Sequence, residues 1–201
     1  RNDVRRTVGN QVVSITRQAR LAGLAGKLAI GAVETALWDV AGKALNTPVY
    51  NLLGGKFRDS VPLSWSLPIV DIKTAVDEGL QMVDRGWRIL KVKVGRKAAD
   101  EDIAMVKALR EAVGDSISIR ADANQAYDFK TAIRVMNGMA PSRLDFLEQP
   151  LHMDDLDGMA EITRQSPIPI MADESAKSLE NLAMLAHKRA ADYVSIYIIG
   201  P

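Results

Sequence analysis

The stretch Ile89-Leu-Lys-Val-Lys-Val94 combines an apolar face and a charged face within six residues. In a β-strand, successive side chains point to opposite sides, so the leucine and the two valines share one side and Lys91 and Lys93 share the other. Parallel strands that are covered by helices on both faces are normally apolar throughout. The two lysines therefore predict a strand that packs on helices with one side and points both ammonium groups into a barrel with the other.

On both sides of this stretch, short β-rich runs alternate with amphipathic helical stretches, which predicts βαβ units and a parallel sheet. Asp128 and Ser178 are in the positions of helix N-caps, and Gly114 is in the position of a helix stop. The expected strands are 61–67, 89–94, 117–122, 145–148, 168–173 and 193–198, and the expected helices include 27–45, 72–85 and 102–113.

Polar residues recur at nearly even intervals at the expected strand ends. Intervals of 29, 26, 25 and 24 residues separate Lys93, Asp122, Glu148, Asp173 and Tyr197. Even spacing favours a (β/α) TIM-type barrel over an open sheet. A complete eightfold barrel needs about 250 residues, whereas residues 61–201 provide 141. We therefore expect an α/β fold with an incomplete barrel of about six strands.

The composition excludes several classes of protein. Of the 201 residues, 26 are Lys or Arg and 25 are Asp or Glu, so there is no basic excess of the kind that nucleic-acid binding requires. No apolar run approaches the roughly 18 residues of a membrane span. The chain has no cysteine, which excludes disulfides and thiolate metal sites. We expect a soluble, cytoplasmic protein with no nucleic-acid or membrane partner.

Three carboxylates and two lysines are expected at one mouth of the barrel. Charged side chains are rarely buried unpaired, so Asp122, Glu148, Asp173 and the two lysines must compensate one another or bind something. Three carboxylates form an all-oxygen ligand set that suits Mg²⁺ or Mn²⁺. Lys91 and such an ion would favour a neutral amine on Lys93. A metal ion facing a base predicts proton abstraction next to a carboxylate.

Four ordered motifs carry a resemblance to a known family: Lys91-Val-Lys-Val-Gly95, Asp122-Ala-Asn-Gln125, Glu148-Gln-Pro150 and Asp173-Glu-Ser175. In order and spacing they resemble the enolase superfamily, and in particular the muconate-lactonizing (muconate cycloisomerase) subgroup of the mandelate racemase/muconate lactonizing enzyme family. Residues 31–45 and 52–55 are similar to that family's passage from capping domain to barrel. The resemblance implies that 1–55 is the C-terminal part of an α+β capping domain and 56–201 is the partial barrel.

The resemblance also implies a role for each site residue. Asp122, Glu148 and Asp173 would bind Mg²⁺ or Mn²⁺, Lys93 would be the acid/base residue, and Lys91 would be its electrostatic companion. We expect Asn124 to orient these groups rather than to bind the ion.

Tyr197 departs from the pattern, because the subgroup usually has a second lysine at the end of the sixth strand. A phenol titrates near pH 10 and carries no positive charge, so Tyr197 is a poor second acid/base group.

We expect a metal-dependent, cycloisomerase-like isomerase that removes a proton α to a carboxylate through an enediolate. It would act on a small carboxylate substrate as a homo-oligomer. Three alternatives stay open: an amino-acid or dipeptide racemase/epimerase, a Schiff-base aldolase with Lys93 as nucleophile, and a truncated or degenerate barrel without catalysis.

Overall fold

The computed structural model describes residues 23–196, which divide into two compact units. The first unit, up to Val61, holds helix α2 (Gly23–Ala44) and the short helix α3 (Val49–Leu52). Helix α2 covers the stretch 27–45 that the sequence predicted as helix, apart from its last residue. The second unit, Pro62–Ile196, holds all the described strands and every described residue of the expected site.

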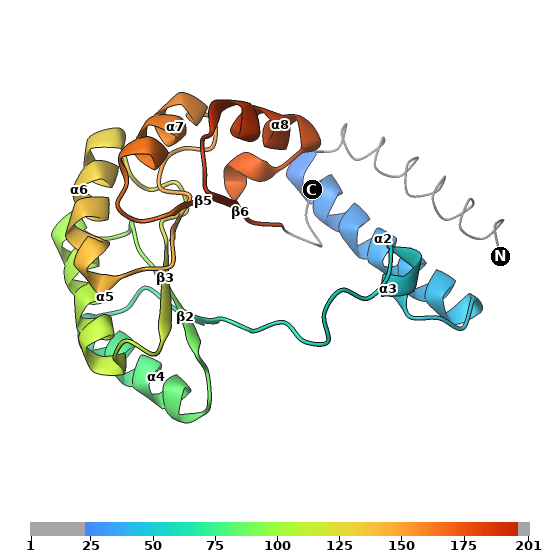
Figure 1. The fold of residues 1–201 in the computed structure, drawn as a ribbon, viewed down its shortest axis with the longest axis horizontal. Helices are drawn as coiled ribbons and strands as arrows, with labels where there is room; N and C mark the ends of the chain where they lie inside the picture. Colours follow the sequence, from blue (N-terminus) through green and yellow to red (C-terminus); the bar gives the residue numbers. More distant parts are fainter. Residues whose placement is uncertain (1–22, 197–201) are drawn as a thin grey trace. The chain divides into compact units, whose positions relative to one another are not determined.

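Six parallel strands form the sheet of the second unit, in the order in which they occur along the chain. Helices lie along the outer side of the strands (Figure 1). The strands are β1 (Trp65–Leu67), β2 (Ile89–Lys93), β3 (Ser118–Asp122), β4 (Leu147–Glu148), β5 (Ile170–Ala172) and β6 (Tyr193–Val194). The helices are α4 (Ile72–Asp84), α5 (Ala99–Val113), α6 (Phe129–Met139), α7 (Leu156–Gln165) and α8 (Leu179–Lys188), with 3₁₀ turns η1 (Ala140–Ser142) and η2 (Glu174–Ala176).

This topology confirms the expected α/β fold with a parallel, barrel-like sheet. Each strand pairs with the strands before and after it in sequence, as in a barrel and unlike an open sheet whose order reverses. Within the described residues β1 pairs only with β2 and β6 pairs only with β5, so the sheet is not closed. The strands are shorter than expected: β1 is the last three residues of the expected 61–67, β4 is the last two of 145–148, and β6 is the first two of 193–198.

The helix boundaries follow from local capping. Asp128 accepts a hydrogen bond from the backbone N–H of Thr131, and Ser178 accepts one from the N–H of Asn181, so both predicted N-caps are confirmed. Gly114 ends α5 with φ of 74°, as predicted. The predicted start of α5 was wrong, because the helix begins at Ala99, three residues earlier. Its first turn carries three acidic residues, whose negative charges interact favourably with the positive end of the helix dipole.

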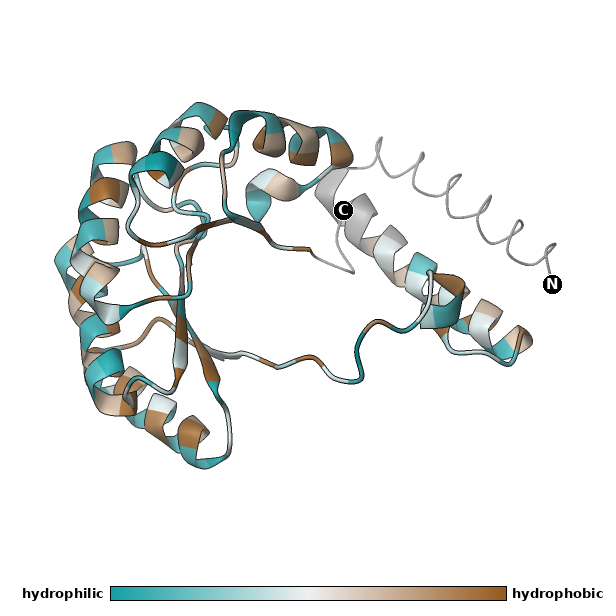
Figure 2. Cartoon of the chain, viewed as in Figure 1, coloured by the Kyte–Doolittle hydropathy of each residue, from teal (hydrophilic) through white to brown (hydrophobic). Residues whose placement is uncertain are grey.

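The core of the second unit lies between the strands and the helices. The helix-facing residues Leu90, Ile119, Leu147 and Ile170 are all fully buried. Burying one such side chain contributes about 1.5–3 kcal/mol, so this layer holds the strands in register. The helices carry both apolar and polar residues, as expected for elements with one face on the core (Figure 2).

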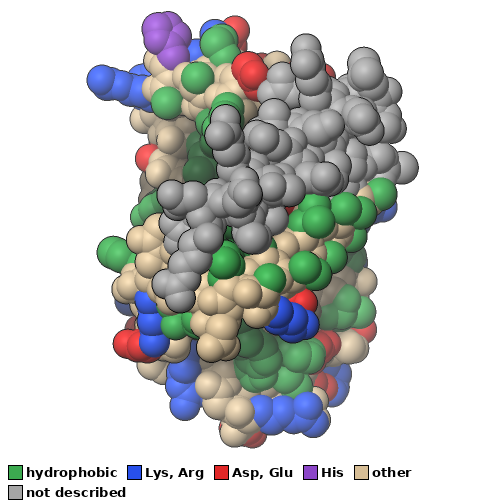
Figure 3. Space-filling model, turned by 90° about the vertical axis from the view of Figure 1, so that its right-hand side faces the viewer, with side chains coloured by type: hydrophobic (Ala, Val, Ile, Leu, Met, Phe, Trp, Pro, Cys, Tyr) green, Lys and Arg blue, Asp and Glu red, His purple; other side chains and the backbone are tan. Residues whose placement is uncertain are grey.

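Large apolar side chains are exposed in both units. Val40, Leu53 and Phe57 of the first unit and Leu63 of the second are more than half exposed, and Figure 3 shows hydrophobic side chains among polar ones on the face that it views. None of the helices between residues 23 and 196 has the length and apolar character needed to cross a bilayer.

Candidate active site

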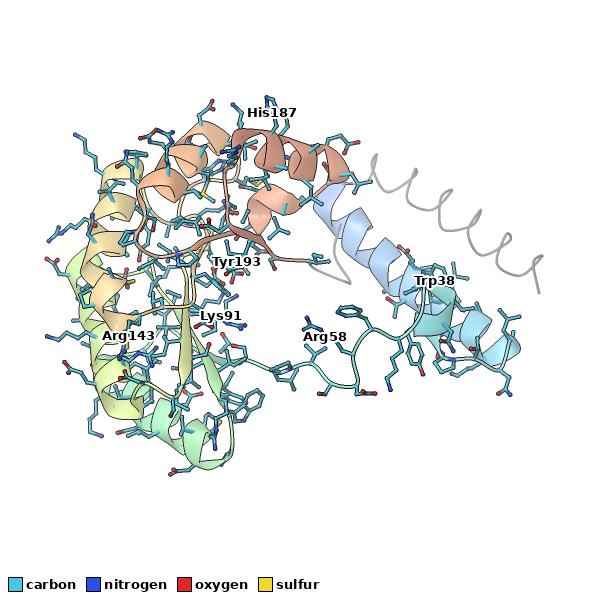
Figure 4. All side chains as sticks on the ribbon, viewed as in Figure 1. Trp38, Arg58, Lys91, Arg143, His187 and Tyr193 are labelled. Atoms are coloured by element: carbon cyan, nitrogen blue, oxygen red, sulfur yellow. The ribbon has the colours of Figure 1, made fainter. Side chains whose placement is uncertain are left out.

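Strand β2 positions both lysines as the sequence predicted. Leu90 and Val92 are buried on the helix side, whereas the side chains of Lys91 and Lys93 are on the other side and are 24% and 31% exposed. Figure 4 shows Lys91 on the inner side of the strands, away from the helices. The amine groups are therefore partly shielded yet still accessible to a small molecule.

Asp122 lies at the centre of the charged cluster. In the parallel register it is opposite Lys93, and its Oδ2 atom is 2.6 Å from Lys93 Nζ and 2.8 Å from Lys91 Nζ. Burial raises the pKa of the Asp122 carboxyl, but hydrogen bonds and charge from the two lysines outweigh burial and hold the pKa below its usual value. Asp122 is therefore a buried carboxylate that both lysines keep ionised.

Glu148 extends the cluster to the next strand. It is opposite Asp122 in the register of β3 and β4, and Lys91 Nζ lies 2.9 Å from its Oε1 and 2.8 Å from its Oε2. Burial has the largest effect on the pKa of Glu148. Burial and the negative charges of Asp122 and Asp173 raise this pKa above its usual value, although the hydrogen bond and charge of Lys91 lower it.

Lys91 bridges two of the predicted metal ligands. Burial disfavours its charge, but the hydrogen bonds and charges of Asp122 and Glu148 outweigh burial and raise the pKa of Lys91. The structure thus gives Lys91 a specific contact role as the cation that joins the ends of β3 and β4.

Asp173 follows the end of β5 and opens the turn η2. It is half-buried, and its charge is among the influences that raise the pKa of Glu148. The structure therefore brings four of the expected residues into direct contact, and the fifth, Asp173, is linked to them through its charge.

Asn124 contacts the groups that it was expected to orient. Its Oδ1 accepts a hydrogen bond from Lys93 Nζ at 2.6 Å, and its backbone N–H donates to Asp122 Oδ1 at 3.1 Å. Its Nδ2 donates to Glu174 Oε1 at 3.2 Å. The orienting role stays a prediction.

Glu174 is a neighbour of this site that sequence reasoning missed, and its Oε2 atom is buried without a hydrogen-bond partner among the described residues.

Tyr197 lies outside the described residues, so its predicted place at the end of the sixth strand stays a prediction. The last described strand, β6, ends at Val194, and Ile196 is the last described residue.

A buried polar pair that the sequence analysis did not single out supports the loops behind the lysines. Asp102 on α5 accepts hydrogen bonds from the N–H of Gly95 at 2.9 Å and from the hydroxyl of Tyr127 at 2.8 Å. Gly95 has φ of +89°, and a Cβ there would lie 2.4 Å from the Cβ of Ala126, so only glycine fits. A usable signal was present, because Asp102 is a carboxylate on the otherwise apolar face of α5.

Comparison with protein families gives two matches that together cover most of the chain. Residues 74–199 match the family described as "Enolase C-terminal domain-like", and residues 6–54 match "Mandelate racemase / muconate lactonizing enzyme, N-terminal domain". The chain therefore belongs to the enolase superfamily, and within it to the muconate-lactonizing subgroup of the mandelate racemase/muconate lactonizing enzyme family.

Individual relatives catalyse different reactions. The chain is 34% identical to an N-succinyl-L-Arg/Lys racemase of Bacillus cereus over 169 residues, covering 84% of this chain and 46% of the relative. It is 37% identical to muconate cycloisomerase 1 of Pseudomonas putida over 167 residues, covering 83% of this chain and 44% of the relative. The chain thus spans about half the length of the curated relatives that it matches.

Solved structures agree with this assignment. The muconate lactonizing enzyme of Pseudomonas fluorescens in complex with muconolactone matches with a TM-score of 0.87 and 35% identity, over 96% of this chain and 51% of that one. The dipeptide epimerase of Enterococcus faecalis V583 matches with a TM-score of 0.78 and 35% identity, over 82% and 47%. Fold and subgroup are therefore shared, while the reactions of these relatives differ.

Members of the superfamily use a divalent metal ion, typically Mg²⁺. The residues present fit such an ion by their chemistry: the three carboxylates are all-oxygen donors, and their negative charge exceeds the positive charge of the two lysines. As positioned, the described residues include no group of three or more His, Asp or Glu side chains that could hold a metal. The metal-ligand assignment of Asp122, Glu148 and Asp173 stays a prediction.

Proposed function

We propose that this chain contributes the proton-transfer residues of a metal-dependent isomerase that removes a proton α to a carboxylate, with a cycloisomerase-like reaction. The observation that carries the proposal is the contact of Lys93 with Asp122 and Asn124 beside the ion-paired Lys91 and Glu148. This arrangement supports an amine held at a fixed place on the accessible side of the sheet.

Each residue has a separate task in this reaction. In the direction from lactone to open diacid, Lys93 Nζ accepts the α-proton, an enediolate forms, and its electrons expel the ring oxygen on the β-carbon as a carboxylate, after which Lys93 passes the proton to solvent. In the reverse direction the carboxylate oxygen adds to that carbon and Lys93 Nζ protonates the enediolate. Asp122 and Asn124 hold the amine through two acceptors at 2.6 Å, which fixes its direction. Lys91 keeps Glu148 and Asp122 together. A divalent ion bound by Asp122, Glu148 and Asp173 would supply positive charge where negative charge develops on the substrate carboxylate.

The second candidate is a racemase or epimerase of small carboxylates. The similarity to the N-succinyl-L-Arg/Lys racemase and to the dipeptide epimerase favours it. A racemase that works on both enantiomers needs an acid/base group on each side of a planar intermediate. Lys93 supplies one side, and the predicted second position holds Tyr197, whose neutral phenol is a weak substitute for an ammonium group. We therefore rank the one-base reaction first.

The test is exchange of the substrate α-proton with deuterium from solvent, measured by NMR with Mg²⁺ or Mn²⁺ present. Muconolactone and N-succinyl amino acids are suitable probes, because the relatives' names specify these chemistries. Replacing Lys93 by Ala is expected to reduce exchange by about 10²–10⁴-fold, the usual contribution of a general base. The matched control is Lys107→Ala, because Lys107 is exposed on α5 and is expected to leave exchange unchanged.

Three outcomes test the base assignment and distinguish the isomerase from the racemase and the Schiff-base aldolase. Equal exchange in the Lys93→Ala variant and the parent contradicts the base assignment. Exchange accompanied by loss of optical activity in an N-succinyl amino acid favours the racemase. Reductive trapping of a substrate on Lys93 by borohydride, without a metal requirement, favours the Schiff-base aldolase.

A further inference from the structure

The side chain next to Glu148 is a completely buried amide. Gln149 has 0% exposure, and its backbone is in the left-handed region with φ of +36°, which is uncommon for a residue other than glycine. Its backbone N–H donates to the carbonyl of Met171 on β5 at 2.8 Å, and its carbonyl accepts from the N–H of Gln125 at 2.7 Å. Gln149 is therefore fixed between the loops that follow β3 and β5.

Four hydrogen bonds use both ends of the Gln149 side chain. Oε1 accepts from the N–H of Asp173 at 2.9 Å and from the N–H of Ser175 at 3.0 Å. Nε2 donates to the carbonyl of Leu151 at 3.0 Å and to Ser175 Oγ at 2.8 Å. An amide offers two donors and two acceptor lone pairs, so the hydrogen-bonding capacity of this side chain is fully used.

This pattern requires an amide at position 149. A carboxylate has no donor for the Leu151 carbonyl, and an apolar side chain leaves the two N–H groups of Asp173 and Ser175 without an acceptor. A polar group that is buried without a partner destabilises the fold, so the turn η2 would shift to find other partners. The Asp173 N–H belongs to the same residue as the third predicted metal-binding carboxylate, and any such shift moves that carboxylate.

We infer that Gln149 is a positioning residue that sets the place of the Asp173 carboxylate relative to Glu148 for binding a divalent cation. The inference rests on the metal site of the proposed function. Glu148 and Gln149 are consecutive, so one loop carries one predicted ligand directly and holds another through the amide. The spacing between these two carboxylates then depends on a side chain that binds no ion itself.

A purely structural role would lower stability without a specific effect on metal binding, and a control variant separates the two cases. Gln149→Met keeps the length of the side chain and removes all four hydrogen bonds. Ile162→Ala removes a fully buried side chain on α7 and is expected to lower the melting temperature through the cavity that it leaves, without changing any hydrogen bond of Gln149. Both variants and the parent are titrated with Mn²⁺ by calorimetry well below their melting temperatures, with folding checked by circular dichroism.

Gln149→Met is expected to weaken Mn²⁺ binding about 10–100-fold, as loss of a residue that supports a ligand does, while Ile162→Ala keeps the parent's Kd. An unchanged Kd in Gln149→Met, or an equal loss in both variants, overturns the inference while the metal site itself stands. A parent chain that does not bind Mn²⁺ overturns the metal site of the proposed function, and the inference fails with it.

A second variant covers the case in which Gln149→Met does not fold. Ser175→Ala removes one of the four partners and leaves the bond from the Asp173 N–H to Gln149 intact. It is expected to weaken Mn²⁺ binding measurably but by less than the 10–100-fold of Gln149→Met, because three of the four hydrogen bonds remain. An unchanged Kd in Ser175→Ala then overturns the inference.

Discussion

The strand pair β2–β3 and the strand pair β5–β6 belong to one sheet but differ in how they are held. β2 and β3 pair from Ile89 to Lys93, a five-position register, whereas β5 and β6 pair over two positions. The helix-facing residue Ile119 of β3 is fully buried, but Val194, the helix-facing residue of β6, is 41% exposed. The first pair also carries the Lys93–Asp122 contact.

The difference shows where the fold can fix charged groups. A charge needs shielding and fixed partners to be held in one place, and the long register and covered face of β2–β3 provide both. Asp173 follows the end of β5, and Gln149 holds its backbone N–H. Within residues 23–196, its side chain has no hydrogen bond or ion pair of its own. Side-chain ion pairs thus fix the part of the site on β2 and β3, and hydrogen bonds between loops fix the part that follows β5.

The largest effect is expected from shortening the helix-facing side chains of the two strand pairs. Ile119→Ala is expected to lower the free energy of unfolding by about 2–5 kcal/mol, because it leaves a cavity in a closely packed layer. Val194→Ala is the matched change at the edge and is expected to cost within about 0.5 kcal/mol, as at other exposed positions. Urea denaturation measures both, and equal losses would contradict the contrast between the two pairs.

Removing the bridging cation is expected to have the next largest effect. Lys91→Met leaves the buried carboxylates of Asp122 and Glu148 close together with one cation fewer, and we expect a loss of about 2–3 kcal/mol at pH 7. The range for a fully buried pair is about 3–5 kcal/mol, and the partial exposure of Lys91 reduces it. The control Lys107→Met breaks an exposed pair with Glu111 and is expected to cost less than about 1 kcal/mol. A gain in stability for Lys91→Met would show that the cluster does not depend on this lysine.

The smallest effect depends on pH and compares two tyrosines. Tyr127→Phe removes a donor to the buried Asp102 and is expected to cost about 1–2 kcal/mol at pH 7. Burial raises the pKa of Asp102, and the hydrogen bond from Tyr127 lowers it, so the variant raises this pKa further. The loss is therefore complete at pH values where Asp102 is ionised, and it shrinks as the pH falls through the folded-state pKa.

The control for this prediction is Tyr193→Phe on β6, where the tyrosine is half exposed. We expect a change within about 0.5 kcal/mol at every pH. Unfolding curves between pH 4 and pH 8 measure both variants. A loss in Tyr127→Phe that stays constant over this range would contradict the coupling to Asp102.

Local sequence rules were sufficient for the type and order of the elements and for the two faces of β2, but not for every boundary. The period-two alternation in residues 89–94 correctly separated Leu90 and Val92 from the two lysines, because side-chain direction in a strand is set by the backbone itself. Asp128, Ser178 and Gly114 marked helix ends because capping uses contacts within a few residues. The start of α5 was missed, since Ala98 provides no side-chain signal for a cap.

The order of residues along the chain is enough to show that acidic and basic residues stand at the ends of successive parallel strands, and hence to indicate the superfamily. Which of these charges meet depends on the folded chain. Lys91 joins Asp122 to Glu148 because the register of β2, β3 and β4 places them side by side, and register depends on packing between residues far apart in the chain. Likewise, the contact between the Gln149 amide and the backbone of Asp173 cannot be predicted from the motif Glu148-Gln-Pro150, because it forms only when the loops after β4 and β5 pack together.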